Sequence, residues 1–239
     1  MRVGSTVLLS EQRCVQSYEW SLKRPLGSLQ GVLDSLEEYH CDEVAIIRPV
    51  RANDSLKCFQ QDIKVVQQLT TMTPISFGGG IRTIEHLNLL QDLPIERLVF
   101  SSLFLDNEEA LISKAKDLFG HQAIQCLLPM MMREGEAYVY HSEHNVYIPF
   151  SSIDCAFISE LANEIILFDI KHEGQNDCFD WLLLDSTPFT TKKIIISGGI
   201  GHQDIKKAAF KNVASVLIDN KILHQEYSIL GYKHATNLS

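Results

Sequence analysis

The chain has 239 residues, of which 45% are hydrophobic, so it can bury a large core in one domain or two. Its 30 acidic and 21 basic residues give a net charge of −9, which argues against nucleic acid or an anionic membrane surface as a partner. We expect neither a signal peptide nor a membrane span, because every apolar run is far shorter than the roughly 20 residues that cross a bilayer. Six scattered cysteines without a CxxC pair suggest reduced thiols and a cytoplasmic location.

Short apolar segments of strand type alternate with segments of helical period along the whole chain. Ser28, Asn107 and Ser152 are expected to begin three of the helices. The eight expected strands are Val3–Leu9, Glu43–Ile47, Pro74–Phe77, Arg97–Phe100, Ala123–Leu128, Glu164–Phe168, Lys193–Ser197 and Ala214–Ile218. The helical segments include Ser28–Tyr39, Cys58–Leu69, Ile84–Leu90, Asn107–Leu118, Ile153–Ala162 and Asp204–Phe210.

This alternation predicts an α/β fold, a single (β/α)₈ TIM barrel over residues 1–239. The alternative is a doubly wound open sheet, whose dinucleotide-binding glycines would follow the first strand. Ser10–Arg13 stands there instead, so the barrel is favoured. Glu136–Tyr140 and Asn145–Ile148 alternate like two short strands around a polar turn, and we expect them to form a β-hairpin inserted after strand 5.

Two glycine-rich turns, Gly78–Ile81 and Gly198–Gly201, lie half a chain apart. Each follows a strand-like run and precedes a helical segment, so the chain reads as two copies of one half. Glycine lets the backbone approach a ligand closely, and free N–H groups at a helix start favour an anion. The pattern suggests a ligand with a phosphate at each end. The competing interpretation is a pair of tight strand-to-helix connections without a ligand.

The ordered set of motifs resembles the HisF/HisA barrels of histidine biosynthesis. Its members are Phe77–Arg82, Glu96–Ser102, Phe119–Ala123, Arg133–Glu136 and Asn163–Leu167, with Ser197–Gly199 after the seventh strand. HisF, the cyclase subunit of imidazole glycerol phosphate synthase, is the more similar of the two. The resemblance covers the whole chain and implies a partner, the HisH-like glutaminase, whose ammonia enters the bottom of the barrel. It implies no cofactor.

The resemblance implies an ammonia gate at the bottom of the barrel, formed by a ring of alternating charges. The matching positions are Arg2, Glu43, Arg97 and Glu164. The alternative is a ring of charges that only closes the end of the barrel.

At the top of the barrel the resemblance places two catalytic aspartates, at positions that are Leu8 and Pro129 here. Neither side chain can transfer a proton, so ordinary cyclase chemistry is not expected. Glu11, Glu134 and Glu173 are the carboxylates that could replace them.

Phosphate binding is implied at two places. At one end Gly79, Gly80, Ser101, Ser102 and Gly174 supply N–H and hydroxyl donors, and at the other end Gly198, Gly199 and Asn220 stand in the matching places. Asp219 lies before Asn220 where the family has small neutral residues, so the second site is expected to be degenerate or to take a different group.

Two polar clusters remain. His141 and His144 could suggest a metal, but without a cysteine or third histidine nearby in the sequence we expect a solvated turn and no metal site. Asp169, Lys171, His172 and Glu173 follow the sixth strand and could hold a polar substrate, or form a solvated loop.

Three functions stay open. The first is a diverged HisF-like paralogue that conducts ammonia for sugar amidation in surface polysaccharide synthesis and holds a phosphorylated small molecule. The second is a cyclase of histidine biosynthesis, a lyase, with relocated catalytic groups. The third is a scaffold, without catalysis, that activates a glutaminase.

Overall fold

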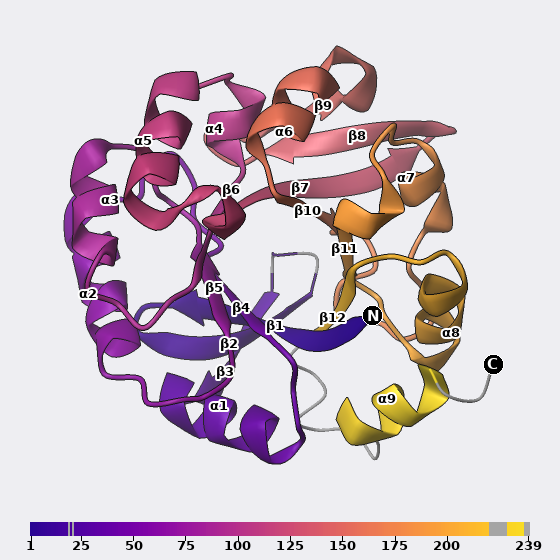
Figure 1. Cartoon of the computed structure of the whole chain (residues 1–239), viewed down its shortest axis with the longest axis horizontal. Coiled ribbons are helices and arrows are strands. Elements are labelled where there is room, and N and C mark those ends of the chain that lie inside the picture. Colours follow the sequence, from indigo (N-terminus) through magenta and orange to yellow (C-terminus); the bar gives the residue numbers. More distant parts are fainter. Residues whose placement is uncertain (19, 21, 220–228, 237–239) are drawn as a thin grey trace.

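Eight parallel strands close into a ring in the computed structural model, which describes every residue except 19, 21, 220–228 and 237–239 (Figure 1). The ring is closed because the last of these strands pairs with the first and the fifth pairs with the sixth. It confirms the predicted barrel and excludes the open sheet. In ring order the strands are β1 (Arg2–Ser10), β4 (Val44–Ile47), β5 (Ile75–Gly78), β6 (Arg97–Phe100), β7 (Ile124–Arg133), β10 (Glu164–Asp169), β11 (Ile194–Ser197) and β12 (Ser215–Asp219).

Helices surround the ring of strands in Figure 1. Ser28 caps the first of them, as predicted, by accepting a hydrogen bond from Gly31 N–H at 3.2 Å. Two predicted starts are wrong. Asn107 adopts a left-handed conformation before a helix capped at Glu108, and Ser152 lies in a short 3₁₀ turn while Asp154 caps the helix that follows. The helices are α1 (Leu29–Glu38), α2 (Leu56–Gln67), α3 (Ile84–Leu90), α4 (Ser102–Leu105), α5 (Glu109–Phe119), α6 (Cys155–Leu161), α7 (Trp181–Asp185), α8 (His202–Phe210) and α9 (Ile229–Thr236).

Two hairpins extend from the barrel, and the sequence predicted only one of them. The predicted insertion is present as β8 (Glu136–His141) and β9 (Val146–Pro149), which extend an antiparallel sheet from the end of β7. The second hairpin, β2 (Arg13–Tyr18) and β3 (Leu22–Gly27), follows β1 directly. Cys14–Tyr18 in its first strand carries no polar–apolar alternation and Pro25 lies in its second strand, so no periodic sequence signal marks this hairpin.

Alternate residues of the barrel strands pack in two separate cores, to which β5 contributes only on the outer side. On β1, Val7 and Leu9 pack outward in the large core that includes Leu29 and Leu33 of α1, whereas Leu8 belongs to an inner cluster inside the ring. This alternation follows from the two-residue period of a strand. The inner cluster consists of Leu8, Val15, Trp20, Ala45, Ile47, Val99, Leu127, Tyr140, Ile166, Phe168, Ile170, Ile195 and Leu217.

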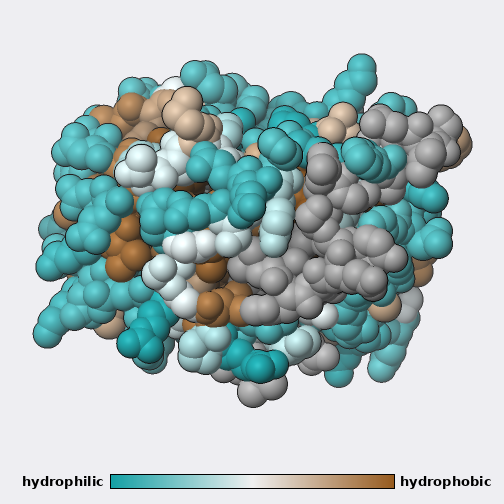
Figure 2. Space-filling view, turned by 90° about the horizontal axis from the view of Figure 1, so that it is seen from below, coloured by the Kyte–Doolittle hydropathy of each residue, from teal (hydrophilic) through white to brown (hydrophobic). Residues whose placement is uncertain are grey.

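The face of the molecule in Figure 2 is mostly hydrophilic, and its apolar residues show in small separate areas. Among the described residues, no helix has both the length and the hydropathy needed to cross a membrane. All six cysteines lie in the described part of the chain and are free thiols.

Candidate functional site: the two ends of the barrel

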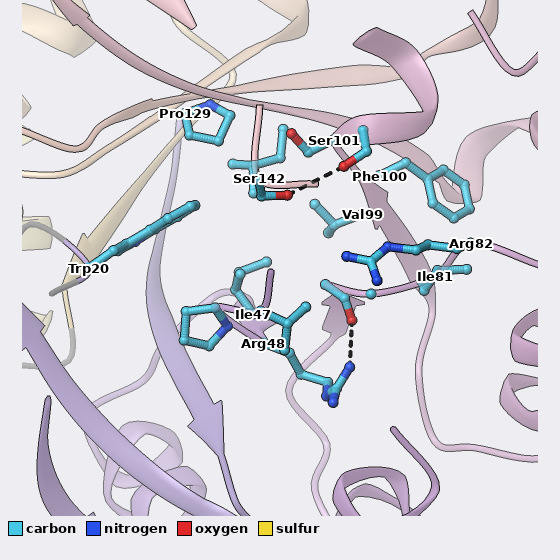
Figure 3. Close-up of a pocket in the computed structure, with 16 residues that line it drawn as sticks. Trp20, Ile47, Arg48, Ile81, Arg82, Val99, Phe100, Ser101, Pro129 and Ser142 are labelled. Carbon is cyan, nitrogen blue, oxygen red and sulfur yellow. Dashed lines mark hydrogen bonds between the residues drawn. The ribbon is translucent and has the colours of Figure 1, made fainter. Parts of the chain in front are cut away.

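A narrow pocket opens at the top of the barrel, where the strands of the first half have their carboxyl ends. Gly79, Gly80, Ser101 and Ser102, which the sequence grouped as phosphate ligands, all line it. Trp20 and Arg82 lie on opposite sides of this pocket (Figure 3). Its free volume of about 40 Å³ holds a few waters rather than a large ligand.

Donors for an anion are present in the pocket. The Ser101 hydroxyl is buried and has no hydrogen-bond partner among the described residues. The Arg82 guanidinium donates to the Arg51 carbonyl at 2.8 Å and lies 3.4 Å from a carboxylate oxygen of Glu143. A buried hydroxyl without a partner and a nearby cation together favour an anionic group in this place.

A second arginine at this pocket is fully used by the fold. Arg48 is buried and bonds Asp54 and Asp62, each at 2.8 Å, and it also donates to the carbonyl of Gly79 at 3.0 Å. A Cβ on Gly79 would lie 2.2 Å from the Arg48 carbonyl oxygen, so only glycine fits there. The packing of this turn therefore requires glycine whether or not a ligand binds.

Leu8 and Pro129, the positions of the family's catalytic aspartates, lie among apolar side chains. Leu8 is 2% exposed and pairs in register with Ile47, while Pro129 stands opposite Phe168. The ring of Trp20 packs 5.2 Å from that of Phe168. No proton-transfer group is supplied by either position.

The three substitute carboxylates do not reach the pocket. Glu11 and Glu134 are exposed in left-handed turns, and neither lines the pocket. Glu173 is buried and accepts hydrogen bonds from the Ser17 hydroxyl at 2.8 Å and from Trp20 N–H at 2.7 Å. Its carboxylate thus ties the β2–β3 hairpin to the loop after β10.

At the second glycine turn the protein places its own carboxylate. Oδ2 of Asp219 accepts hydrogen bonds from Gly174 N–H at 2.9 Å and from Gly199 N–H at 3.3 Å. Gly174 therefore lies beside the second turn and not with Gly80, which corrects the grouping made from the sequence. The loop after β10 folds toward β12, a contact that no local sequence signal marks. Asn220 lies outside the described residues.

Further carboxylates surround this second turn. Asp177 accepts a hydrogen bond from Gln203 N–H at 2.7 Å, and Asp204 accepts one from Gly201 N–H at 3.2 Å, both at the start of α8. Burial, with the charges of Asp177 and Asp219, raises the pKa of Tyr232 to about 12. Amides that could bind a phosphate are already bonded, and the local charge opposes a second anion.

The remaining polar groups after β10 hold their own loop. Asp169 is buried and accepts hydrogen bonds from His172 Nδ1 at 2.7 Å and from Asp180 N–H at 2.9 Å. Burial raises the pKa of Asp169, against the lowering effect of His172. Burial also raises the pKa values of Cys14 and Cys41 to about 12, so neither is a thiolate nucleophile at neutral pH.

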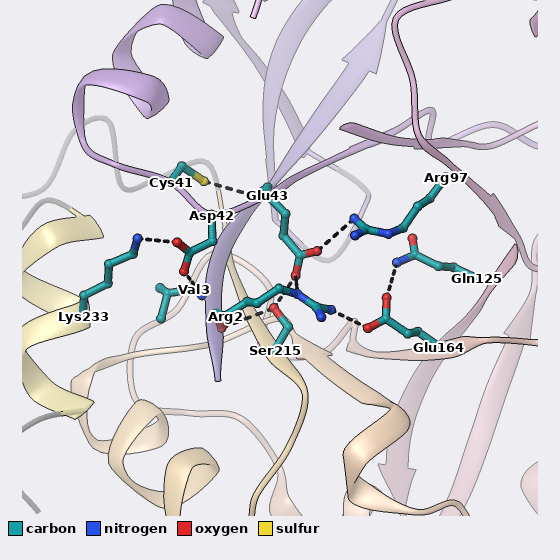
Figure 4. Close-up of polar contacts among 10 residues, drawn as sticks. All are labelled: Arg2, Val3, Cys41, Asp42, Glu43, Arg97, Gln125, Glu164, Ser215 and Lys233. Atoms are coloured by element: carbon teal, nitrogen blue, oxygen red, sulfur yellow. Dashed lines mark hydrogen bonds and ion pairs between the residues drawn. The ribbon is translucent and has the colours of Figure 1, made fainter. Parts of the chain in front are cut away.

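At the bottom of the barrel the four charged residues come together (Figure 4). Arg2 bonds Glu43 at 3.0 Å and Glu164 at 2.5 Å, and Arg97 bonds Glu43 at 3.3 Å. Burial lowers the pKa of Arg2, but Glu164 and Glu43 outweigh this effect and raise it overall. In the described part of the chain no ion pair joins Arg97 to Glu164. Gln125 takes that place and donates to Glu164 at 2.9 Å.

The four charges are therefore joined by three ion pairs, and Gln125, bonded to Glu164, occupies the side where a fourth pair would lie. The sequence analysis did not single out Gln125. It lies two residues before Leu127, so its side chain points to the same inner face of β7. Its Oε1 atom is buried and has no partner within the described structure. Above it lie the apolar residues of the inner cluster, including Ala45, Val99 and Ile166.

Comparisons with known proteins agree with this architecture. A family model described as "Histidine biosynthesis protein" matches residues 2–228. The chain is 26% identical over 228 residues to a putative imidazole glycerol phosphate synthase subunit hisF2 of Campylobacter jejuni, covering 93% of this chain and 89% of that protein. It is 22% identical over 229 residues to the imidazole glycerol phosphate synthase subunit HisF of an Exiguobacterium species, covering 95% and 89%. A carboxamide isomerase of Buchnera aphidicola matches at 22% identity over 91% of each chain.

Proposed function

Because this HisF-like chain belongs to the histidine biosynthesis protein family, we propose that it is the barrel subunit of a glutamine-dependent enzyme and receives ammonia from a HisH-like glutaminase. The observation that carries the proposal is the contrast between the two ends of the barrel. At the bottom, three ion pairs hold the four charged residues in a ring. At the top, Leu8 and Pro129 stand where the family has its proton-transfer groups.

The chemistry of the ring suits a neutral, hydrogen-bonding molecule. Ammonia donates hydrogen bonds, and the Oε1 atom of Gln125 is a buried acceptor without a partner beside Glu164. The apolar cluster above it admits a neutral molecule far more readily than an ion, because an unpaired charge in such surroundings is costly. Ammonia rather than ammonium is the species that would pass.

The bottom face also carries apolar side chains that suit a protein partner. Met72 is 93% exposed in the loop before β5, and Phe210 is 88% exposed at the end of α8, before β12. Loops that precede barrel strands lie at the amino end of the barrel, the same end as the ring. We propose these two side chains as contacts for the partner at this end of the barrel.

At the top we propose that the first-half pocket binds one phosphate or a comparable anion. Asp219 and its neighbours oppose an anion in the second half, so a ligand with a phosphate at each end is disfavoured. This asymmetry supports a diverged role, which we propose to be the amidation of a sugar in surface polysaccharide synthesis. A cyclase of histidine biosynthesis is the alternative that the relatives' names favour.

The test is the rate of glutamine hydrolysis by the HisH-like glutaminase of the same organism, measured alone and with the barrel. We expect the barrel to co-purify with the glutaminase and to raise its rate. Arg97→Ala removes one ion pair of the ring and should alter this coupling, whereas Arg133→Ala, an exposed arginine at the opposite end of the barrel, should not. Equal rates in all mixtures without co-purification would refute the partnership.

A parallel assay with the HisF substrate and added ammonium separates the two enzymatic functions. Loss of both proton-transfer groups should lower turnover by about 10²–10⁴-fold per group relative to a working cyclase. Turnover at the usual cyclase rate would favour the histidine pathway.

A further inference from the structure

Three potential metal ligands meet where the β8–β9 turn lies against α4. His141 is the last residue of β8, His144 lies three residues on in the turn, and Asp106 follows α4. Nε2 of His141 is 3.1 Å from Oδ1 of Asp106, and Nε2 of His144 is 3.6 Å from the same oxygen. One ligand atom from each residue lies within 4.8 Å of the other two.

The burial of the three side chains is that of a half-open site. The His141 side chain is 4% exposed and fixed by packing, whereas those of Asp106 and His144 are 34% and 60% exposed. The imidazole rings of His141 and His144 stack with centroids 4.3 Å apart. The buried His141 side chain is held in place, and the two more exposed side chains, those of Asp106 and His144, can change rotamer to bind an ion.

We propose that Asp106, His141 and His144 form a binding site for a divalent transition-metal ion. Two imidazoles and a carboxylate are the donor set of zinc sites in which a fourth position stays open to water. Imidazole donors disfavour Mg²⁺ and Ca²⁺, which prefer an all-oxygen environment. The sequence concealed this site because Asp106 is 35 residues from His141 and only the pairing of β6 with β7 and β8 brings the end of α4 to the turn.

Binding requires one change of protonation. His141 Nε2 and Asp106 share a hydrogen bond, and the backbone N–H of His144 points at His141 Nδ1 over a long 3.4 Å. On binding, the neutral ring changes tautomer: Nε2 gives its proton to solvent and its lone pair to the ion, and Nδ1 takes up a proton from solvent, so no net proton is released. The backbone N–H of His144 then loses its long contact with Nδ1. Because His144 is exposed, the turn can adjust to this loss.

The site adjoins the top pocket without belonging to it. Ser142, in the same turn, lies 3.3 Å from the Ser102 hydroxyl, and Glu143 pairs with Arg82. Both contacts join the turn to residues that line the pocket. A bound ion would therefore fix the turn over the pocket mouth.

The test measures Zn²⁺ binding to the full chain, freed of metal with a chelator, by calorimetry. We expect one ion per chain in the wild type, and at least about tenfold weaker binding in His144→Ala and in Asp106→Asn. The matched control is His121→Ala, an exposed histidine on another face, which should bind as the wild type does. Circular dichroism of each variant checks that the fold is kept.

Co²⁺ provides a second probe that distinguishes imidazole and carboxylate ligands from the partly exposed thiols. The expected spectrum has visible d–d bands and no thiolate charge-transfer band, and His144→Ala removes it. The proposal is overturned by the absence of saturable Zn²⁺ binding, by binding that survives both substitutions, or by a thiolate spectrum.

Discussion

Replacing Asp219 with alanine tests whether its carboxylate fills an anion site. Asp219 is 5% exposed, and its Oδ2 atom accepts hydrogen bonds from the N–H groups of Gly174 and Gly199. These two donors belong to loops 25 residues apart in the chain, so the carboxylate also holds the loop after β10 against the turn after β11. The substitution leaves both donors without their acceptor.

The expected effect follows from these two contacts. An unpaired buried N–H costs about 1–3 kcal/mol, and the Gly174 contact is only partly buried, so the free energy of unfolding should fall by roughly 2–4 kcal/mol. In a chain of this length such a loss lowers the melting temperature by roughly 5–15 °C. Inorganic phosphate should then occupy the vacated position and restore about 1.4 kcal/mol at ten times its Kd.

The assay is thermal and denaturant unfolding with and without phosphate. The matched control is Asp185→Ala, which removes an exposed partner of Lys211 and should unfold like the wild type under both conditions. A variant that is as stable as the wild type would refute the structural role of Asp219. A destabilised variant that phosphate does not restore would show that the turn is no anion cradle.

Two further predictions concern residues near the first-half pocket. Arg48→Ala leaves the buried carboxylates of Asp54 and Asp62 without their cation and should lower the free energy of unfolding in denaturant by about 3–5 kcal/mol. The same change at Arg51, which packs over Tyr140 but has no carboxylate partner in the described structure, should cost only about 0.5–2 kcal/mol. Burial lowers the pKa of His86, so the unfolded chain takes up a proton before the folded one does. The stability that neutral His86 contributes is present above the unfolded pKa of about 6.5 and is lost as the pH falls through the lowered folded pKa. A wild-type stability profile that does not differ in slope from that of His86→Gln between pH 7 and 5 would contradict this.

The sequence by itself determined the eight barrel strands, most of the helices between them and their order, but not the β2–β3 hairpin. Strand and helix periods are local, so runs such as Glu164–Phe168 and Ser28–Tyr39 were found in place, as was the inserted hairpin. The four charges of the bottom ring were identified through the resemblance to HisF, and the structure brings them together because strand starts meet at one end of a closed barrel.

Only the tertiary structure decided which loops meet. The position of Gly174 beside Gly199 and the approach of Asp106 to His141 both depend on how the loops after the strands fold over the top of the barrel. A strand's period fixes which side chains point inward, but it carries no information about the direction in which the following loop turns. That direction is set by long-range packing and hydrogen bonds, which exist only once the barrel has closed.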